Sequence, residues 1–348
     1  MPSTIWRRPR NKSCAAARNR VRFMNADDRI RAGRRRLAAS VLAAWTLAMA
    51  GPLAPTPATA APPPLRIDLD RFDAMKKTIA LPDGVTLGYV EFGSPMGKPV
   101  VLIHGYTDSA RDWVPLVPYL SKTLRLILVD IRGHGISSKP ECCYARIDVA
   151  YDMKLLLDAL HIPSADIVGH SFGSIIAQTL AEYWPARTHS VVLISSTALP
   201  FDRPTAKDGK PTRPAFDFRT PILALKDPID PESPFMIAWW GSPTPVDAEF
   251  LRRQRGDAAA IPARVWLAVL DQGLSGADLQ STLPKLKAPA LLIWGSEDPI
   301  IDIAGRQALR EALPTARVKI FDKLGHNPFW EDPQGVADVV NDFLLHGS

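Results

Sequence analysis

A serine between two glycines is the first residue in this sequence whose setting suggests chemistry. Gly169, Ser171 and Gly173 form a Gly-x-Ser-x-Gly pattern; an apolar run precedes it, and apolar residues at helical spacing follow it. The two glycines permit a sharp turn from strand to helix, which leaves the serine hydroxyl exposed at the N-terminus of the helix. We therefore predict that Ser171 is a nucleophile.

A serine hydroxyl needs a base, and His326 is the best placed of the seven histidines. The base must take the hydroxyl proton as the serine attacks, and imidazole does this near neutral pH. His326 lies late in the chain, in the loop from Leu324 to Pro328 after an apolar run, whereas the other histidines flank other turns or lie at helix and strand ends. The pattern Gly-x-Ser-x-Gly occurs by chance in roughly one chain in ten of this length, so it is weak evidence by itself. A suitably placed histidine strengthens the prediction that Ser171 is a nucleophile.

The third residue is an acid that orients the histidine. Asp298 follows the apolar run from Leu291 to Trp294, so it falls at the carboxyl end of a predicted core strand, where ligands gather in parallel sheets. An acid there fixes the histidine tautomer and stabilises the imidazolium. Glu297 is the neighbouring alternative.

The segments that must position these residues alternate between strand and helix. Their runs are continuously apolar, which predicts a mostly parallel sheet with helices on both faces, an α/β fold. We expect a hairpin around Pro82-Asp83-Gly84. Further strands are expected at 98–103, 124–131, 165–170, 191–195, 290–294 and 317–321, and helices at 110–120, 148–160, 303–313 and 333–345.

The alternation is lost between the strands expected at 191–195 and 290–294. We interpret residues 199–283 as a helical lid inserted into a core formed by 75–198 and 284–348, with a proline-rich spacer at 61–74. The aromatic side chains of this segment are candidates to contact an apolar part of a substrate; they are Phe235, Trp239, Trp240 and Trp266.

Residues 1–60 have the order of an export signal. Arg34 to Arg36 precede fourteen uncharged residues, and small residues end the segment at Ala60. The adjacent arginines are typical of twin-arginine signals, and a start at Met24 would shorten the leader. A membrane span needs about twenty apolar residues. We therefore expect cleavage after Ala60, a periplasmic or secreted protein and no stable membrane span after cleavage; an uncleaved anchor is the alternative.

The formal net charge of +6 is concentrated in that leader. Residues 1–60 hold 12 of the 42 Lys and Arg but only two of the 36 Asp and Glu, which leaves 30 basic against 34 acidic residues. We therefore expect no nucleic-acid partner.

Neighbouring Cys142 and Cys143 can form a disulfide only through a strained eight-membered ring, which favours free thiols. No zinc-binding spacing occurs, and neither a metal nor another cofactor is expected.

Taken in order, these motifs resemble the α/β-hydrolase superfamily, in particular its capped serine esterases and lactonases. The resemblance rests on His104-Gly105, Asp130-x-Arg-Gly-His-Gly-x-Ser137, Gly169-His-Ser-Phe-Gly173, Asp298 and Gly325-His326. It implies an oxyanion hole formed by the backbone N–H groups of Tyr106 and Phe172.

The expected function is hydrolysis of a small carboxylic ester or lactone through an acyl-enzyme intermediate, with Ser171, His326 and Asp298 as the catalytic triad. Acyl transfer, perhydrolysis and carbon–carbon bond hydrolysis on the same triad are alternatives. A ligand-binding protein without turnover is a further alternative from a different class. Serine in the nucleophile position argues against the alkyl-enzyme chemistry of dehalogenases and epoxide hydrolases, which the resemblance associates with aspartate.

Overall fold

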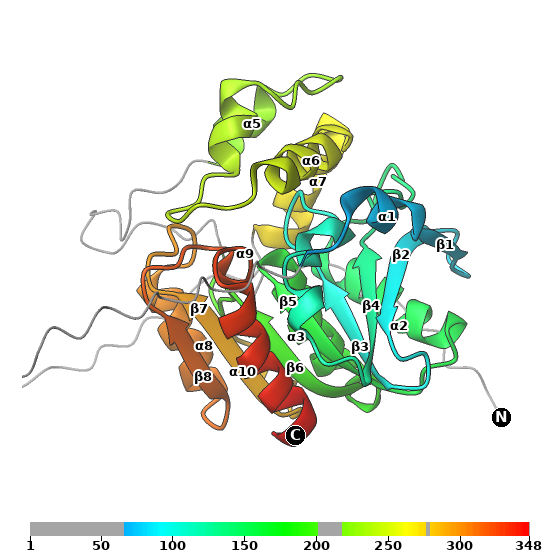
Figure 1. Ribbon diagram of the computed structural model, residues 1–348, viewed down its shortest axis with the longest axis vertical. Helices are drawn as coiled ribbons and strands as arrows, with labels where there is room; N and C mark the ends of the chain where they lie inside the picture. Colours follow the sequence, from blue (N-terminus) through cyan, green and yellow to red (C-terminus); the bar gives the residue numbers. More distant parts are fainter. Residues whose placement is uncertain (1–65, 201–217, 276–278, 348) are drawn as a thin grey trace, which may run out of the picture. The chain divides into compact units, whose positions relative to one another are not determined.

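A single eight-stranded sheet organises the residues that the computed structural model describes, which are 66–200, 218–275 and 279–347 (Figure 1). The strand order is β1-β2-β4-β3-β5-β6-β7-β8. The strands are β1 (Lys77–Ala80), β2 (Thr86–Gly93), β3 (Lys98–Ile103), β4 (Leu124–Asp130), β5 (Ala165–His170), β6 (Thr188–Ile194), β7 (Ala290–Gly295) and β8 (Arg317–Phe321).

The sheet is parallel from β4 to β8, and β2 joins it antiparallel to both β1 and β4. Strands β5 and β7 are buried along their whole length, as expected for continuous apolar runs that are covered on both faces. The register sets the central strands level at their carboxyl ends, because Ile103 pairs with Gly169 and His170 pairs with Ile194. The loops that follow these strands therefore meet at one edge of the sheet.

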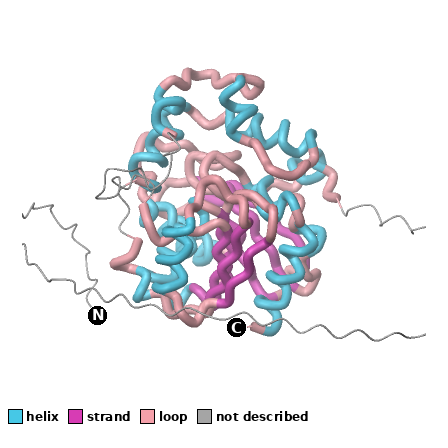
Figure 2. The backbone as a smooth tube through the Cα atoms, turned by 90° about the vertical axis from the view of Figure 1, so that its left-hand side faces the viewer, coloured by secondary structure: helices cyan, strands magenta, loops and turns pink. Residues whose placement is uncertain are grey.

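Helices cover both faces of the sheet, as the turned view shows (Figure 2). Apolar side chains from these helices and from the strands form one buried core. The helices of the core are α1 (Leu69–Ala74), α2 (Arg146–Ala159), α3 (Phe172–Tyr183), α8 (Ile303–Ala312), α9 (Pro328–Glu331) and α10 (Pro333–His346), with short 3-10 turns η3 (Pro185–Arg187) and η5 (Leu283–Lys285).

Between β6 and β7 the described residues form a separate group of helices. In Figure 1, α5, α6 and α7 lie together beyond one end of the strands. The elements are α4 (Arg219–Leu223), α5 (Pro234–Trp239), α6 (Ala248–Ala259), α7 (Ala263–Val269) and the π-helical turn η4 (Leu270–Leu274). We call this group the lid; residues 201–217 of the predicted insertion lie outside the described residues, as do residues 1–65 with the predicted export signal.

Two local expectations were wrong. The segment 110–120 forms two 3-10 turns, η1 (Ala110–Trp113) and η2 (Val117–Tyr119), in place of one helix. Pro115 and Pro118 explain the difference, because proline has no N–H to donate within a helix. Cys142 and Cys143 are joined by a disulfide, contrary to the expected free thiols, and Cys143 adopts a φ of 77° that the sequence did not indicate.

Candidate active site

Ser171 occupies a sharp turn between β5 and α3. Its φ of 49° and ψ of −117° belong to neither strand nor helix, and α3 begins at the next residue. The backbone N–H of Ser171 donates to the carbonyl of Ile194 at 2.9 Å, which ties the turn to the neighbouring strand. The side chain lines a pocket at the carboxyl edge of the sheet, as a nucleophile at a strand-to-helix turn should.

The two glycines of the motif are required by close packing. A Cβ on Gly169 would lie 2.3 Å from the carbonyl oxygen of Gly173, and a Cβ on Gly173 would lie 2.1 Å from the carbonyl oxygen of Ile103. Any larger residue would therefore force β5 and α3 apart, or α3 away from β3. The turn that presents Ser171 depends on glycine at both positions.

His326 and Asp298 form a hydrogen-bonded pair. Nδ1 of His326 lies 3.0 Å from each carboxylate oxygen of Asp298 and donates to that carboxylate. The carboxylate is buried, and Oδ1 also accepts hydrogen bonds from the backbone N–H groups of Ile300 and Ile301. Burial alone would raise the pKa of Asp298, but its interactions with His326 and with these two N–H groups outweigh burial and lower it. Asp298 is therefore ionised at neutral pH.

Two residues that the sequence analysis did not single out as site residues hold the backbone of His326. Its carbonyl oxygen accepts a hydrogen bond of 2.7 Å from Oγ of Ser195 and lies 3.1 Å from Nε2 of His170. Both residues end strands of the sheet or follow them directly, so they fix the histidine loop relative to Ser171. No motif in the sequence marks this contact, because it joins residues more than 130 positions apart.

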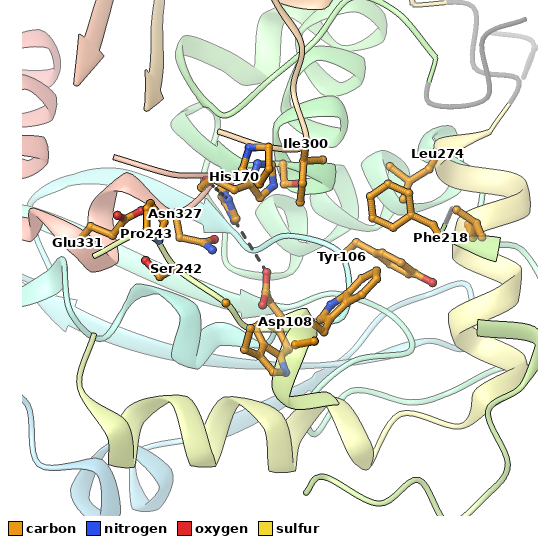
Figure 3. Close-up of a pocket in the computed structure, with 18 residues that line it drawn as sticks. Tyr106, Asp108, His170, Phe218, Ser242, Pro243, Leu274, Ile300, Asn327 and Glu331 are labelled. Carbon is orange, nitrogen blue, oxygen red and sulfur yellow. Dashed lines mark hydrogen bonds and ion pairs between the residues drawn. The ribbon is translucent and has the colours of Figure 1, made fainter. Parts of the chain in front are cut away.

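A cavity of about 140 Å³ lies over these residues, and Figure 3 shows its lining side chains. Ser171 and His326 both line it, together with Tyr106 from the loop after β3. Asp298 lies behind His326 and outside this lining. The structure thus places the predicted nucleophile and base at one pocket, with the predicted acid bonded to the base.

The proposed oxyanion donors lie next to Ser171 in the fold. Phe172 is the first residue of α3, where a backbone N–H has no partner within the helix. Tyr106 lies in the loop after β3, and within the described part of the chain no group accepts the backbone N–H of either residue. The phenol of Tyr106 donates to the carbonyl of Trp266 at 2.6 Å, which attaches this loop to the lid.

The aromatic candidates of the lid divide into two groups. Trp239 and Trp240 line the cavity, whereas Phe235 and Trp266 do not. The ring centroids of Phe235 and Trp266 lie 5.4 and 5.6 Å from that of Trp239, so these residues pack behind it. The indole N–H of Trp239 donates to Oγ1 of Thr107 at 3.0 Å and fixes the lid to the loop after β3.

His104 and His134 are buried structural groups beside this edge. Nδ1 of His104 donates to the carbonyl of Gly105, and its Nε2 accepts the backbone N–H of Ile131. The neutral ring can make both hydrogen bonds. A proton on Nε2 would point at the N–H of Ile131, which is itself a donor. Burial, as the largest cause, lowers the pKa of both His104 and His134 to about 3.

Asp108, Asp112 and His170 form a buried cluster next to Ser171. Their nearest ligand atoms lie within 4.8 Å of one another, a spacing that could hold a cation. Nδ1 of His170 lies 3.4 Å from Oδ2 of Asp112, and neither atom has a hydrogen-bond partner within the described residues. Burial raises the pKa of Asp108 well above its usual value. The nearby charge of Asp112 raises it further, because a proton on Asp108 removes the repulsion between the two acids.

Comparisons with known proteins identify the family of this chain. Residues 98–333 match the model of the α/β hydrolase fold family, and the chain therefore belongs to that family. It is 22% identical over 278 residues to the human monoacylglycerol lipase ABHD6, a match that covers 72% of this chain and 77% of the lipase.

Two solved structures show the same fold. An esterase from Rhodococcus sp. superposes with a TM-score of 0.66 at 24% identity, covering 79% of this chain and 100% of the esterase. An enol-lactonase from Burkholderia xenovorans gives a TM-score of 0.63 at 24% identity, covering 77% of this chain and 99% of the lactonase.

Proposed function

We propose that the protein is an exported serine hydrolase that cleaves a small carboxylic ester or lactone through an acyl-enzyme intermediate. The observation that carries the proposal is the single pocket lined by Ser171 and His326, with Asp298 hydrogen-bonded to the histidine. A serine, a base and an orienting acid in this relation are the parts that acyl transfer requires.

In the proposed reaction Ser171 Oγ attacks the carbonyl carbon while His326 takes its proton. The carbonyl oxygen becomes an oxyanion and is stabilised by the backbone N–H groups of Tyr106 and Phe172. When the carbon–oxygen bond breaks, His326 returns the proton to the leaving alcohol and Ser171 keeps the acyl group. Water then attacks the acyl-enzyme with His326 again as base, which releases the acid and restores the serine.

The walls of the pocket favour an uncharged substrate. None of the described residues that line it is Lys or Arg, so it offers no cation to a carboxylate or a phosphate. Its volume of about 140 Å³ suits a small ester. Related proteins named as a lipase, an esterase and an enol-lactonase support an ester or lactone as the bond that is cleaved.

Export is the part of the proposal that rests on sequence alone. No helix among the described residues is long and apolar enough to cross a membrane, and the predicted leader at 1–60 lies outside them. N-terminal sequencing of protein from the periplasm or medium should begin at or near Ala61. A soluble protein that retains Met1 or Met24 would contradict cleavage.

The catalytic proposal is tested with a panel of short esters and lactones. The wild-type protein should hydrolyse members of the panel, and the Ser171→Ala variant should retain less than about a thousandth of the rate. A folded Ser171→Ala variant with more activity than this would show that Ser171 is not the nucleophile.

A further inference from the structure

The pocket that Ser171 and His326 line has two chemically different ends. In Figure 3 the labelled Phe218 and Leu274 lie on one side with Tyr106, whereas Asn327 and Glu331 lie on the other, and Asp108 projects between the two groups. One end is therefore apolar and aromatic. The other offers polar groups to any ligand that enters.

Several polar groups of the lining are available to a ligand, among them the buried hydroxyl of Ser242, which has no hydrogen-bond partner among the described residues. Both oxygens of Glu331 are already occupied, because they accept the backbone N–H of Gly325 at 2.7 Å and the hydroxyl of Thr244 at 2.6 Å. The side-chain amide of Asn327, by contrast, makes no hydrogen bond with the part of the chain that the structure describes. An amide offers two donors and an acceptor, so Asn327 has its full capacity left.

Asp108 is another available group. Its side chain is nearly fully buried, and its Oδ1 accepts one long hydrogen bond of 3.4 Å from Nε2 of Gln254. Oδ2 lies 3.8 Å from Nδ1 of His170, beyond hydrogen-bond distance, next to the backbone of Gly105. Burial and the charge of Asp112 raise the pKa of Asp108, and its carboxyl oxygens can accept a hydrogen bond from a hydroxyl group.

The chemistry of the triad decides which part of the substrate meets these groups. His326 protonates the leaving alcohol, so the alcohol portion must lie against His326 and its neighbours. Asn327 is the next residue in the chain, and His170, which Asp108 approaches, contacts the backbone carbonyl of His326. The polar end is therefore the alcohol side, and the apolar end beside Tyr106 is the acyl side.

We propose that Asp108 and Asn327 form a subsite for an uncharged hydroxyl group on the alcohol portion, and that the preferred substrates are esters of short hydroxylated alcohols. The inference rests on the proposed function, since it assigns the alcohol side through His326. A hydroxyl both donates and accepts, which matches the two side chains. An acidic alcohol portion is disfavoured, because the described lining holds no Lys or Arg.

The test compares 2-hydroxyethyl butanoate with propyl butanoate, which differ by a hydroxyl in place of a methyl group. The wild-type protein should hydrolyse the hydroxyethyl ester with a kcat/KM about fivefold higher, as expected from one or two neutral hydrogen bonds. Asn327→Ala and Asp108→Ala should each bring this ratio towards one. Asp108→Asn keeps a hydrogen-bonding group of the same shape and should preserve most of the preference.

Leu274→Ala is the matched control at the apolar end. It should lower kcat/KM for both esters and leave their ratio as in the wild type, because both carry the same acyl group. Labelling of Ser171 by a fluorophosphonate establishes that each variant compared is folded. If Asp108→Ala fails to fold, the variants Asp108→Asn and Asn327→Ala still test the subsite.

The two levels of the proposal fail in different ways. Equal turnover of the two esters by the wild-type protein, or a hydroxyethyl preference that survives Asn327→Ala and Asp108→Ala, contradicts the subsite and leaves the hydrolase proposal intact. Turnover of neither ester, together with inactivity on the wider panel, contradicts the hydrolase proposal and the subsite with it.

Discussion

Nδ1 of His326 lies 3.0 Å from both carboxylate oxygens of Asp298, although 28 residues separate the two in the chain. The strands β7 and β8 are parallel neighbours, so the loops that follow them emerge side by side. Their register pairs Gly295 with Phe321 at the last position. This pairing of loops brings the predicted acid and the predicted base together from two distant segments.

The Asp298→Asn variant should lose about a thousandfold or more in kcat. Asparagine keeps the shape but presents an amide to Nδ1, which favours the wrong imidazole tautomer and leaves the imidazolium without its counter-charge. Steady-state kinetics with any turned-over ester measures the effect. Exposed Glu297 is the matched control, and Glu297→Gln should remain near wild type. The reverse pattern would transfer the role of the acid to Glu297.

The Ser195→Ala variant should lower kcat by roughly tenfold with little change in KM. It removes one of two groups that hold the carbonyl of His326, and small displacements of a catalytic base are costly. Ser190→Ala in β6 is the control, because it removes a hydrogen bond of the same 2.7 Å length, to Asp166, away from the pocket. Equal loss of activity in both variants would indicate a general effect on stability and no positioning role for Ser195.

The Gly173→Ala variant should lose about 3 kcal/mol of stability, or fail to fold. Its Cβ would lie 2.1 Å from a backbone oxygen that cannot move without shifting β3. Gly256→Ala in α6 is the opposite case, since nothing lies within 4 Å of the added Cβ. That variant should be about 0.5–1 kcal/mol more stable. Denaturant unfolding measures both, and a Gly173→Ala protein as stable as wild type would contradict the described packing.

The His134→Asn variant should make unfolding less sensitive to acid. The folded-state pKa of His134 is lowered to about 3 from 6.5, chiefly by burial, so below about pH 6.5 the unfolded chain binds a proton that the folded one excludes. Stability therefore falls as the pH decreases towards 3, by about 1.4 kcal/mol per pH unit for one proton. Asparagine still donates to the carbonyl of Arg132 but does not titrate. The free energy of unfolding is measured between pH 7 and 4 for both proteins. If it falls with decreasing pH as steeply in the variant as in the wild type, the pKa of His134 is not lowered in the folded state.

The sequence predicted the fold well because its central strands are continuously apolar and end in recognisable turns. The α/β hydrolase fold was confirmed, and the order of Ser171, Asp298 and His326 placed all three at one edge of the sheet. The roles of these residues remain predictions. Local patterns failed where a contact or a proline overrode them, as at Pro115 and Pro118.

The remainder of the site depends on contacts between distant segments. Asp108 and Asn327 belong to loops 219 positions apart, and only the fold shows that both face one cavity. Trp239 and Trp266 look equivalent in sequence, yet one lines the cavity and the other supports it from behind. Helical periodicity indicates which face of a lid helix is buried, but it does not show which neighbour covers a given residue.

The most direct measurement of the central claim is covalent labelling by a fluorophosphonate, with the modified residue located by mass spectrometry. Protein that begins at Ala61 should be labelled at Ser171 alone, and the His326→Ala variant should react at least about a hundredfold more slowly, because the hydroxyl then has no base. Labelling at another residue, or equally fast labelling of Ser171 in the His326→Ala variant, would contradict an activated serine in this pocket.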